Sequence, residues 1–525
     1  MWSKKVMVKT ELPYSLMFKK NLSISPKWNL NEVLFKFSPF SKGFTISDAV
    51  RGVQIFGGTG SGKTSGSAKK IAISYLKAGF GGLVLCAKKD EMDLWKSLCN
   101  EAGRSDSLVE FSLESVPAFS LNFLEIAQNE FKDVGAVYNI LQLIKVAMGQ
   151  NVKDLVSQGD GDFHYWEAVS NQLLSHVIAV CLYSDKTFTI DLVRDIVQCL
   201  PKEGSETNQF FKNIENSTPT NHLEEVLVKN RNSKIKNEDI LLIERWLYAE
   251  YSKHADKTRG SLISSVTSSF DSLLREPFKS LLFNGRPITP EWCFAGGIIV
   301  VNVPVHQYEA SGKLINLIWK YIFQKAAQKR DVSQKLRPTF LWADEAHHFV
   351  SHFDSEFQTT ARAQMIATVY ITQNLSNYRK ALGSGSQGDD STLSLLGNLS
   401  NKIYHSNPDL ETNTKASKEI GKGWIKRKKP FIFNDLLHTD DKELRPLKIF
   451  EYFLQPEDFS QLASGGSDFK WLVEGVVHSP GSNRFGRKKD FKKCRFYQKK
   501  EPFYKRRNFE HCRPSVDFHE YIKNF

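Results

Sequence analysis

The sequence has few cysteines and no long apolar segment. Its seven cysteines are scattered without a Cys-x-x-Cys pair, a pattern that suits a reducing cytoplasm. The longest apolar runs, such as Val177–Leu182 and Ile298–Val305, are far shorter than a membrane span. No secretory signal opens the chain, because Met1–Lys9 is followed by Thr-Glu-Leu-Pro and not by an apolar core. We therefore expect a soluble, cytoplasmic protein with no membrane span of its own.

Length and composition indicate a large folded protein. At 525 residues the chain is longer than one ordinary domain and suggests roughly two to four. An apolar share of 41% is enough for a large core, so disorder is not expected. The formal net charge of +13 points only weakly toward a polyanionic partner, because it is spread over a long chain.

Much of the excess positive charge lies near the C-terminus. Between Arg484 and Arg513 there are 13 Lys or Arg against 3 Asp or Glu, a net of +10 by subtraction. Aromatic residues interleave with these bases: Phe485, Phe491, Phe496, Tyr497, Phe503, Tyr504 and Phe509. Basic side chains neutralise phosphates and aromatic rings can stack on bases, so this segment predicts contact with nucleic acid or another acidic surface. The alternative is a solvated tail held down by its own aromatics.

A glycine-rich loop carries the clearest chemistry. It follows an apolar strand pattern, Arg51–Phe56, and precedes a helical pattern, Ser65–Leu76. The loop consists of Gly57, Gly58, Thr59, Gly60, Ser61, Gly62, Lys63 and Thr64, and it fills every position of the phosphate-binding P-loop pattern. Glycines let successive N–H groups point at one anion, and the following helix adds its positive end. We predict an ATP site in which Lys63 reaches the β- and γ-phosphates and the Thr64 hydroxyl binds Mg²⁺.

Strand and helix patterns alternate along most of the chain. The predicted strands are Gly52–Phe56, Gly82–Cys86, Gly297–Val303, Thr339–Ala343, Met365–Thr372 and Lys402–His405. Such alternation predicts an α/β fold with a mostly parallel sheet covered on both faces. The region from about Glu130 to Leu282 has helical periodicity with few strand patterns, which predicts an inserted all-α domain.

These patterns divide the chain into five parts. We expect an N-terminal lead-in at 1–50, the nucleotide-binding domain at 51–129 and 283–480, the helical insert at 130–282, and the basic aromatic tail at 481–525. Within them, the polar stretch Lys202–Asn237 is expected to loop out. The glycine- and serine-rich segment Gly383–Ser391 predicts a mobile loop.

An acidic pair is placed to complete a hydrolytic site. Asp344 and Glu345 directly follow the strand pattern Thr339–Ala343. We expect Asp344 to hold the Mg²⁺ shell and Glu345 to orient or deprotonate the attacking water. His347 and His348 follow, but adjacent residues of one element point apart, so a solvated or packed pair is favoured over a metal site.

Two further residues are candidates for sensing and stabilising the γ-phosphate. Gln373 lies at the tip of the next strand and could relay the state of the nucleotide; its alternative role is a turn-capping amide. Arg362 lies 11 residues earlier in a helix, where it could reach a neighbouring subunit's nucleotide as an arginine finger if the subunits form a ring. Its alternative is an ordinary surface arginine.

From about Gly52 to Pro480, the order of these motifs resembles the type IV secretion coupling proteins (the VirD4/TraG/TraD group), within the larger FtsK/HerA-like translocases. The more specific matches are Phe163–Ile178, Lys257–Ser261, Ala361–Gln373, Gly397–Ile403, Asn407–Thr412 and Phe453–Phe459. Typical members carry N-terminal transmembrane helices, and this chain shows none.

The resemblance implies a RecA-like hexameric ring that hydrolyses ATP with Mg²⁺ and drives single- or double-stranded DNA through its channel. It also implies partners, a relaxase and components of a secretion system, and docking at the inner membrane through them. By position it assigns Lys63 and Thr64 to the nucleotide, Asp344 and Glu345 to Mg²⁺ and water, Gln373 to sensing and Arg362 to the trans finger. Two alternatives stay open: a HerA-like soluble motor of repair or phage defence, and a receptor ATPase that recruits a relaxase or secreted protein.

Overall fold

The computed structural model describes residues 28–114, 119–130, 160–201, 221–231, 237–283, 286–333, 336–383, 385–427, 447–486 and 489–498. Its contacts divide the chain into two compact units. The first comprises Met1–Val109, Glu291–Val300 and Ala326–Phe525, and the second comprises Glu110–Pro290 and Val301–Lys325. Among the described residues, no helix combines the length and apolar character that crossing a membrane requires.

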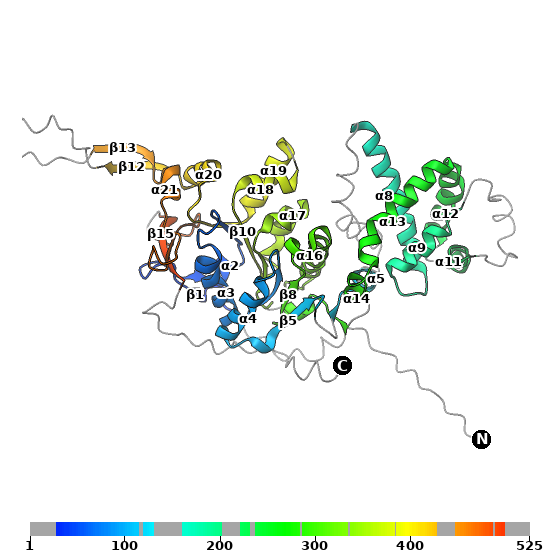
Figure 1. Cartoon of the computed structure of the whole chain (residues 1–525), viewed down its shortest axis with the longest axis horizontal. Coiled ribbons are helices and arrows are strands. Elements are labelled where there is room, and N and C mark those ends of the chain that lie inside the picture. Colours follow the sequence, from blue (N-terminus) through cyan, green and yellow to red (C-terminus); the bar gives the residue numbers. More distant parts are fainter. Residues whose placement is uncertain are drawn as a thin grey trace, which may run out of the picture. The chain divides into compact units, whose positions relative to one another are not determined.

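A nine-stranded sheet organises the first unit, in the order β15-β14-β11-β3-β10-β9-β4-β8-β5. Figure 1 labels β15, β10, β8 and β5 of this sheet. The strands are β3 Val53–Phe56, β4 Gly81–Leu85, β5 Leu108–Ser112, β8 Ile298–Asn302, β9 Thr339–Ala343, β10 Ile366–Thr372, β11 Asn401–Tyr404, β14 Leu472–His478 and β15 Phe491–Tyr497. The pairs from β11 through β3, β10 and β9 to β4 are parallel. β14 and β15 are antiparallel additions at one edge. The predicted mostly parallel α/β sheet is confirmed.

Helices pack on both faces of the central strands. On one face, α3 (Lys69–Lys77) and α4 (Glu91–Ala102) share a buried core with alternate residues of the strands. Trp95 of α4 stacks on Phe340 at a ring distance of 5.4 Å. On the other face, the Tyr370 hydroxyl donates to Asp354 of α17 (His352–Ala361). The alternation of side chains along a strand therefore explains why these strands are buried throughout.

The remaining helices of this unit are α2 Ile46–Ala49, α15 Glu291–Phe294, α18 Leu375–Leu382, α19 Ser386–Asn398, α20 Leu410–Ile420 and α21 Pro456–Ser460. The expected mobile loop Gly383–Ser391 is wrong from Ser386 onward, where α19 begins. Leu395 and Leu396 of α19 are buried, and Arg379 forms an ion pair with Asp389. Tertiary burial of the leucines outweighs the local bias of a glycine- and serine-rich segment.

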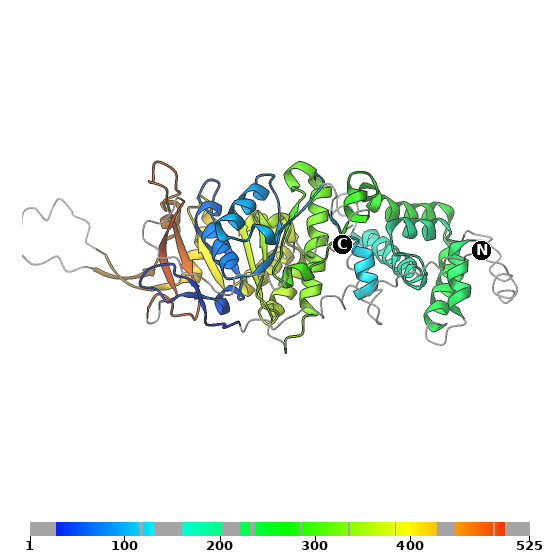
Figure 2. The ribbon, with the colours of Figure 1, turned by 90° about the horizontal axis from the view of Figure 1, so that it is seen from below.

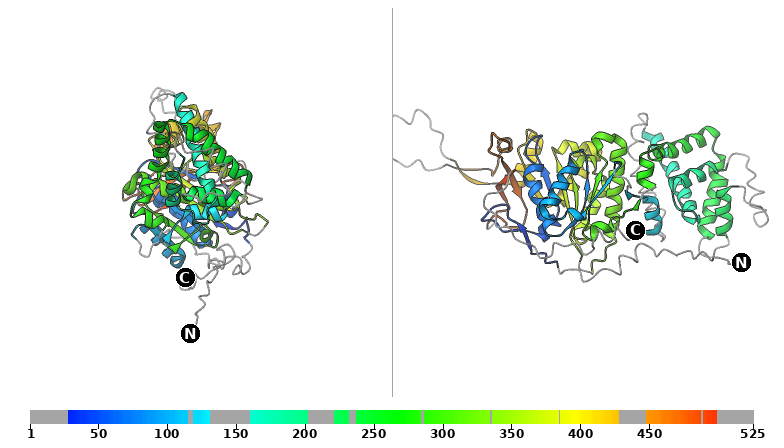
Figure 3. Two further views of the ribbon diagram at one scale, coloured as in Figure 1. Left: turned by 90° about the vertical axis from the view of Figure 1, so that its right-hand side faces the viewer. Right: turned by 60° about the horizontal axis from the view of Figure 1, so that its bottom comes forward.

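The second unit is helical over the described residues 160–283 (Figure 3). Its helices are α8 Asp160–Tyr183, α9 Ile190–Gln198, α11 His222–Arg231, α12 Asn237–Arg245, α13 Asp256–Leu274 and α14 Phe278–Phe283. It also holds α5 Phe123–Glu130 and the short parallel pair β6 Phe119–Ser120 and β7 Arg286–Pro287. α16 Val305–Gln328 begins in this unit and ends in the first one.

The polar stretch Lys202–Asn237 was expected to loop out, and the structure corrects part of that expectation. α11 occupies His222–Arg231 and buries Leu223, Val226 and Leu227. Three apolar residues at helical spacing are enough to anchor one face of a short helix. Residues 202–220 and 232–236 lie outside the described part of the chain.

The predicted C-terminal tail begins as part of the sheet. β15 pairs along its whole length with β14, and Cys494 and Phe496 point into the core. Phe37, in the lead-in between β1 Val33–Phe35 and β2 Phe44–Thr45, packs edge-on against Phe496 at 6.2 Å. Residues 499–525, with Phe503, Tyr504 and Phe509, lie outside the described part of the chain.

Candidate nucleoside triphosphate site

The phosphate loop leaves β3 at the carboxyl edge of the sheet and enters a helical turn, Thr64–Ala68, that continues into α3. Two glycines are required by its shape: Gly60 and Gly62 have φ of 71° and 78°. A Cβ on Gly62 would also lie 2.5 Å from a Val473 methyl group. The Gly58 N–H donates to the Ser406 carbonyl at 2.8 Å. The loop is therefore held by β14 and by the chain that follows β11.

Lys63 is buried within this loop. Its Nζ donates to the carbonyl oxygens of Gly57 at 2.6 Å and Gly58 at 2.9 Å. Burial lowers the pKa of Lys63, while the nearby charges of Asp344 and Glu345 oppose this shift. The ammonium group thus lies inside the loop that would surround the phosphates.

Asp344 meets the phosphate loop from a position 280 residues away in the sequence. The Thr64 hydroxyl donates to Asp344 Oδ2 at 2.7 Å, and the Glu345 N–H donates to Asp344 Oδ1 at 2.9 Å. Parallel pairing places β9 two places away from β3, with β10 between them. A hydroxyl beside a carboxylate is the oxygen donor set that Mg²⁺ prefers, so these two residues fit the ion.

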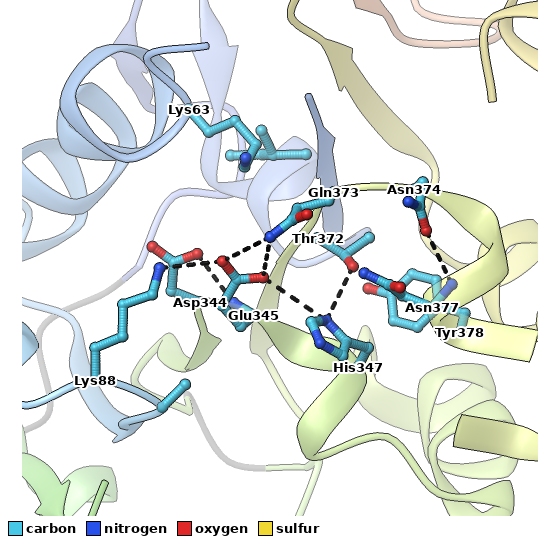
Figure 4. Close-up of polar contacts among 12 residues, drawn as sticks. Lys63, Lys88, Asp344, Glu345, His347, Thr372, Gln373, Asn374, Asn377 and Tyr378 are labelled. Atoms are coloured by element: carbon cyan, nitrogen blue, oxygen red, sulfur yellow. Dashed lines mark hydrogen bonds and ion pairs between the residues drawn. The ribbon is translucent and has the colours of Figure 1, made fainter. Parts of the chain in front are cut away.

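Glu345 lies at the centre of a polar cluster (Figure 4). Its carboxylate accepts from Lys88 Nζ at 3.0 Å and from Gln373 Nε2 at 3.4 and 3.5 Å, and it lies 3.7 Å from His347 Nδ1. Burial raises the pKa of Glu345, but the hydrogen bond and charge of Lys88, with Gln373 and Lys63, outweigh it and hold the pKa below the usual value. The carboxylate is therefore kept ionised, as a base requires.

Lys88 was missed in the sequence, and its placement depends on the sheet. It follows β4, which pairs with β9, so their carboxyl ends bring Lys88 next to Glu345. The adjacent turn is held by buried Glu91, which accepts from the N–H groups of Ala87 at 3.1 Å and Lys88 at 2.9 Å. Burial, aided by the charge of Asp344, raises the pKa of Glu91 well above its usual value. Sequence order alone does not show which strand lies beside β9.

Substituting Lys88 should change how the reaction depends on pH. In Lys88→Met the burial of Glu345 is no longer opposed by its ion pair, so the pKa of Glu345 rises. The base must be deprotonated, so we expect the acidic limb of the pH–rate profile for ATP hydrolysis to move to higher pH. Lys89→Met, a change at the exposed neighbouring lysine, is the matched control. An unmoved acidic limb in Lys88→Met would show that Lys88 does not set the ionisation of Glu345.

The histidine pair differs from the expectation that its side chains point apart. The rings of His347 and His348 lie with centroids 4.3 Å apart in the short helix Ala346–His348. His347 Nδ1 also lies 3.3 Å from the Thr372 hydroxyl. Successive residues of one tight turn stay close, so the rule for a strand does not apply. Among the described residues, no group of three or more His, Cys, Asp or Glu side chains is placed to hold a metal ion.

A buried contact of His405 was not predicted from the sequence either. The ring of His405, just after β11, lies between the Ser67 hydroxyl at 2.6 Å and the Glu474 carbonyl at 2.8 Å. Burial lowers the pKa of His405 to about 4, so the ring is neutral near pH 7. Because a carbonyl only accepts, Nδ1 carries the proton and Ser67 donates to Nε2. This bond joins the helix of the phosphate loop to β11 and β14.

The structure brings Gln373 to the site but leaves Arg362 away from it. Gln373 directly follows β10, while the exposed Arg362 precedes that strand at the end of α17. The seven residues of β10 separate the two positions by roughly 20 Å. Arg362 therefore cannot act on the nucleotide of its own subunit in this arrangement.

The sheet is mostly parallel and carries a phosphate loop after β3. An acidic pair follows β9, two places away, and a polar residue follows β10 between them. This arrangement defines the RecA-like class of P-loop nucleoside triphosphatases. The family model described as type IV secretory system conjugative DNA transfer matches residues 19–430, so the chain belongs to that family. It is a coupling protein of conjugative DNA transfer.

Solved structures show the same fold. The unbound conjugative coupling protein TrwB is 11% identical over 97% of this chain and 95% of its own, with a TM-score of 0.53. TrwB with ADP and Mg²⁺ is 12% identical over 95% of each chain, and TrwB with a non-hydrolysable GTP analogue is 12% identical over 93% of each, both with a TM-score of 0.53. The comparison with curated proteins gives no match.

Proposed function

We propose that this chain is an ATP-driven translocase that moves DNA in conjugative transfer. One observation carries the proposal: Thr64, Asp344, Glu345 and Gln373, from separate parts of the sequence, form one continuous series of polar contacts beside the phosphate loop. A site for binding alone needs the loop, whereas hydrolysis also needs an ionised base beside the γ-phosphate.

The proposed roles follow from these contacts. The N–H groups of the loop from Gly58 to Thr64, with Lys63, hold the phosphates, and Thr64 and Asp344 hold Mg²⁺. Mg²⁺ supplies positive charge on the phosphate oxygens when it is bound. Two observations support this assignment: the oxygen donors of the site suit the ion, and TrwB has been solved with ADP and Mg²⁺ and with a non-hydrolysable ATP analogue.

Glu345 accepts a proton from the attacking water, and Gln373 relays the state of the site. The Gln373 amide contacts Glu345, while its backbone carbonyl accepts from Asn407 Nδ2 at 2.9 Å. The next residue, Asn374, caps α18 by accepting from the Asn377 N–H at 2.9 Å. A movement of Gln373 on hydrolysis would therefore be passed to both α18 and the segment after β11.

ATP turnover with and without DNA tests this function. We expect single- or double-stranded DNA to increase turnover, with Lys63→Ala as the inactive reference. If the protein hydrolysed ATP at the same rate with and without DNA and bound neither form, the translocase proposal would be wrong, although the chain would remain an ATPase.

We further propose a homohexameric ring in which Arg362 acts on the neighbouring subunit. The exposed position of Arg362, away from its own phosphate loop, supports this role. Arg362→Ala and Lys63→Ala subunits should each be inactive alone, but mixing them should restore part of the ATP turnover, because a subunit that keeps Lys63 can receive Arg362 from a Lys63→Ala neighbour. Arg495→Ala, at an exposed position of β15, is the control and should leave turnover unchanged. No restored turnover in the mixture of the two inactive variants would show that Arg362 does not act in trans.

We also propose that the predicted helical insert, 130–282, captures a relaxase or another transferred protein, and that secretion components bring the ring to the inner membrane. This region forms a compact helical unit of its own, from a segment that lies in sequence between strands of the sheet, and this supports a separate binding role. Pull-down of a relaxase with a chain lacking 130–282 tests it, and capture equal to that of the full chain would contradict it.

A further inference from the structure

A two-stranded ribbon precedes the last strands of the sheet. β12 (Lys422–Arg427) pairs antiparallel with β13 (Leu447–Tyr452), and the two strands run side by side away from the nine-stranded sheet (Figures 1 and 2). Directly paired residues include Lys422 with Tyr452 and Trp424 with Phe450. Because side chains of a strand alternate between its faces, these two pairs share one face with Lys448, which lies two residues before Phe450.

The described side chains of this face are large, and apart from the half-buried Tyr452 its aromatic and basic side chains are exposed. Trp424 is 70% exposed and Phe450 is 58% exposed, although their rings pair edge-on at 5.5 Å. Lys422 Nζ lies 4.5 Å from the centre of the Tyr452 ring, and Lys448 is exposed. Among the described residues, no acidic side chain forms an ion pair with Lys422 or Lys448. The face therefore combines aromatic rings and positive charge in alternation.

The opposite face of the ribbon, which carries Gly423 and Glu451, packs toward β15 of the nine-stranded sheet through Phe453. The Phe453 ring lies against Gly423, where an added Cβ would come within 2.3 Å of it. Phe453 also packs on Phe491 of β15 at a ring distance of 5.4 Å. The only acidic residue of the described ribbon, Glu451, pairs with Gly423 on this opposite face and accepts from Gln455 at 3.1 Å. The acidic group is thus separated from the aromatic, positively charged face.

We propose that Lys422, Trp424, Phe450 and Lys448 form a binding face for single-stranded DNA. Two exposed rings are costly for a surface that contacts only water, and they match the unpaired bases of a single strand, on which aromatic side chains stack. The lysines match the phosphates. In a duplex the bases are already stacked on one another, so the rings would have no bases to contact. This proposal rests on the role of the protein in DNA transfer and does not depend on ATP hydrolysis.

Binding is measured without nucleotide, by fluorescence anisotropy with a labelled oligothymidine of roughly 20 nucleotides and with a duplex of the same length. Trp424→Ala/Phe450→Ala should weaken binding of the single strand roughly tenfold or more and change duplex binding less than about twofold. Lys422→Gln/Lys448→Gln should weaken binding of the single strand. It should also make the slope of log affinity against log salt concentration shallower by about 1.4, since each lost phosphate contact on a single strand contributes about 0.7.

Matched controls come from two exposed residues near the N-terminal strands, Lys36 and Phe40, of which Phe40 is 94% exposed. Phe40→Ala and Lys36→Gln should leave both affinities unchanged. ATP turnover without DNA reports folding of each variant and should be unaltered, because the four substituted side chains are exposed on the ribbon. Unchanged binding of the single strand in the aromatic variant would overturn the proposal, and so would an equal loss for the single strand and the duplex. Failure of ATP hydrolysis with these affinities intact would instead count against the translocase function.

Discussion

Lys63→Ala should abolish nearly all ATP hydrolysis. Lys63 is the only positively charged side chain of the described loop Gly57–Thr64, and its Nζ lies within the loop at the carbonyls of Gly57 and Gly58. Losing one preorganised charge or donor on the transferring group costs about a hundred- to a thousandfold in turnover, about 3–4 kcal/mol. The rate of phosphate release at saturating ATP measures the effect.

Two further variants separate charge from folding in this experiment. Lys63→Met keeps most of the side-chain volume and should be as inactive as Lys63→Ala. Lys96→Ala, at an exposed position of α4, should retain full turnover. Turnover within about tenfold of the unaltered protein in both Lys63 variants would mean that hydrolysis does not depend on this charge.

Glu345→Gln should separate nucleotide binding from hydrolysis. The amide has almost the same size and can still accept a hydrogen bond from Lys88, but it cannot take a proton from water. We expect turnover to fall about a hundred- to ten-thousandfold, the usual contribution of a general base. ATP affinity, measured by displacement of a fluorescent nucleotide, should change much less because the phosphate loop and the bond from Thr64 to Asp344 are intact.

Glu356→Gln is the matched control, since Glu356 is an exposed glutamate of α17. It should leave both turnover and affinity unchanged. Equal losses of affinity and turnover in Glu345→Gln would indicate that Glu345 holds the loop in shape and is not the base. The pH–rate profile of Lys88→Met then tests the role of Glu345 independently, because this substitution changes the ionisation of the Glu345 carboxylate without removing the carboxylate.

Local patterns predicted six of the nine strands of the central sheet, β3, β4, β8, β9, β10 and β11, and several of the polar residues that follow them. The strands before the phosphate loop and before Asp344 are buried on both faces, and such strands are apolar throughout, a pattern that is visible without a structure. Gln373 was also predicted, because it directly follows a long apolar strand. These predictions needed only the chain on either side of each residue.

Other features depend on residues far away in the sequence. α19 forms within a glycine- and serine-rich segment because Leu395 and Leu396 are buried against the rest of the unit. β15 was predicted as part of a basic tail, since its lysines and arginine mask the alternation of Cys494 and Phe496 toward the interior. The lysine-aromatic face of the ribbon could not be predicted locally, because it depends on the strand register that pairs Trp424 with Phe450.

The sequence by itself determined the phosphate loop, the acidic pair, Gln373 and the α/β class, because each depends on short-range patterns of glycine, charge and apolar residues. The tertiary structure alone decided that Lys88 forms an ion pair with Glu345 and that His405 joins the loop to β14. It also decided that Arg362 lies away from its own nucleotide site. The order of strands in the sheet controls the first two, whereas Arg362 lies away from the site because it precedes β10 and the site lies where β10 ends. That order results from how the whole chain packs, and no short segment encodes it.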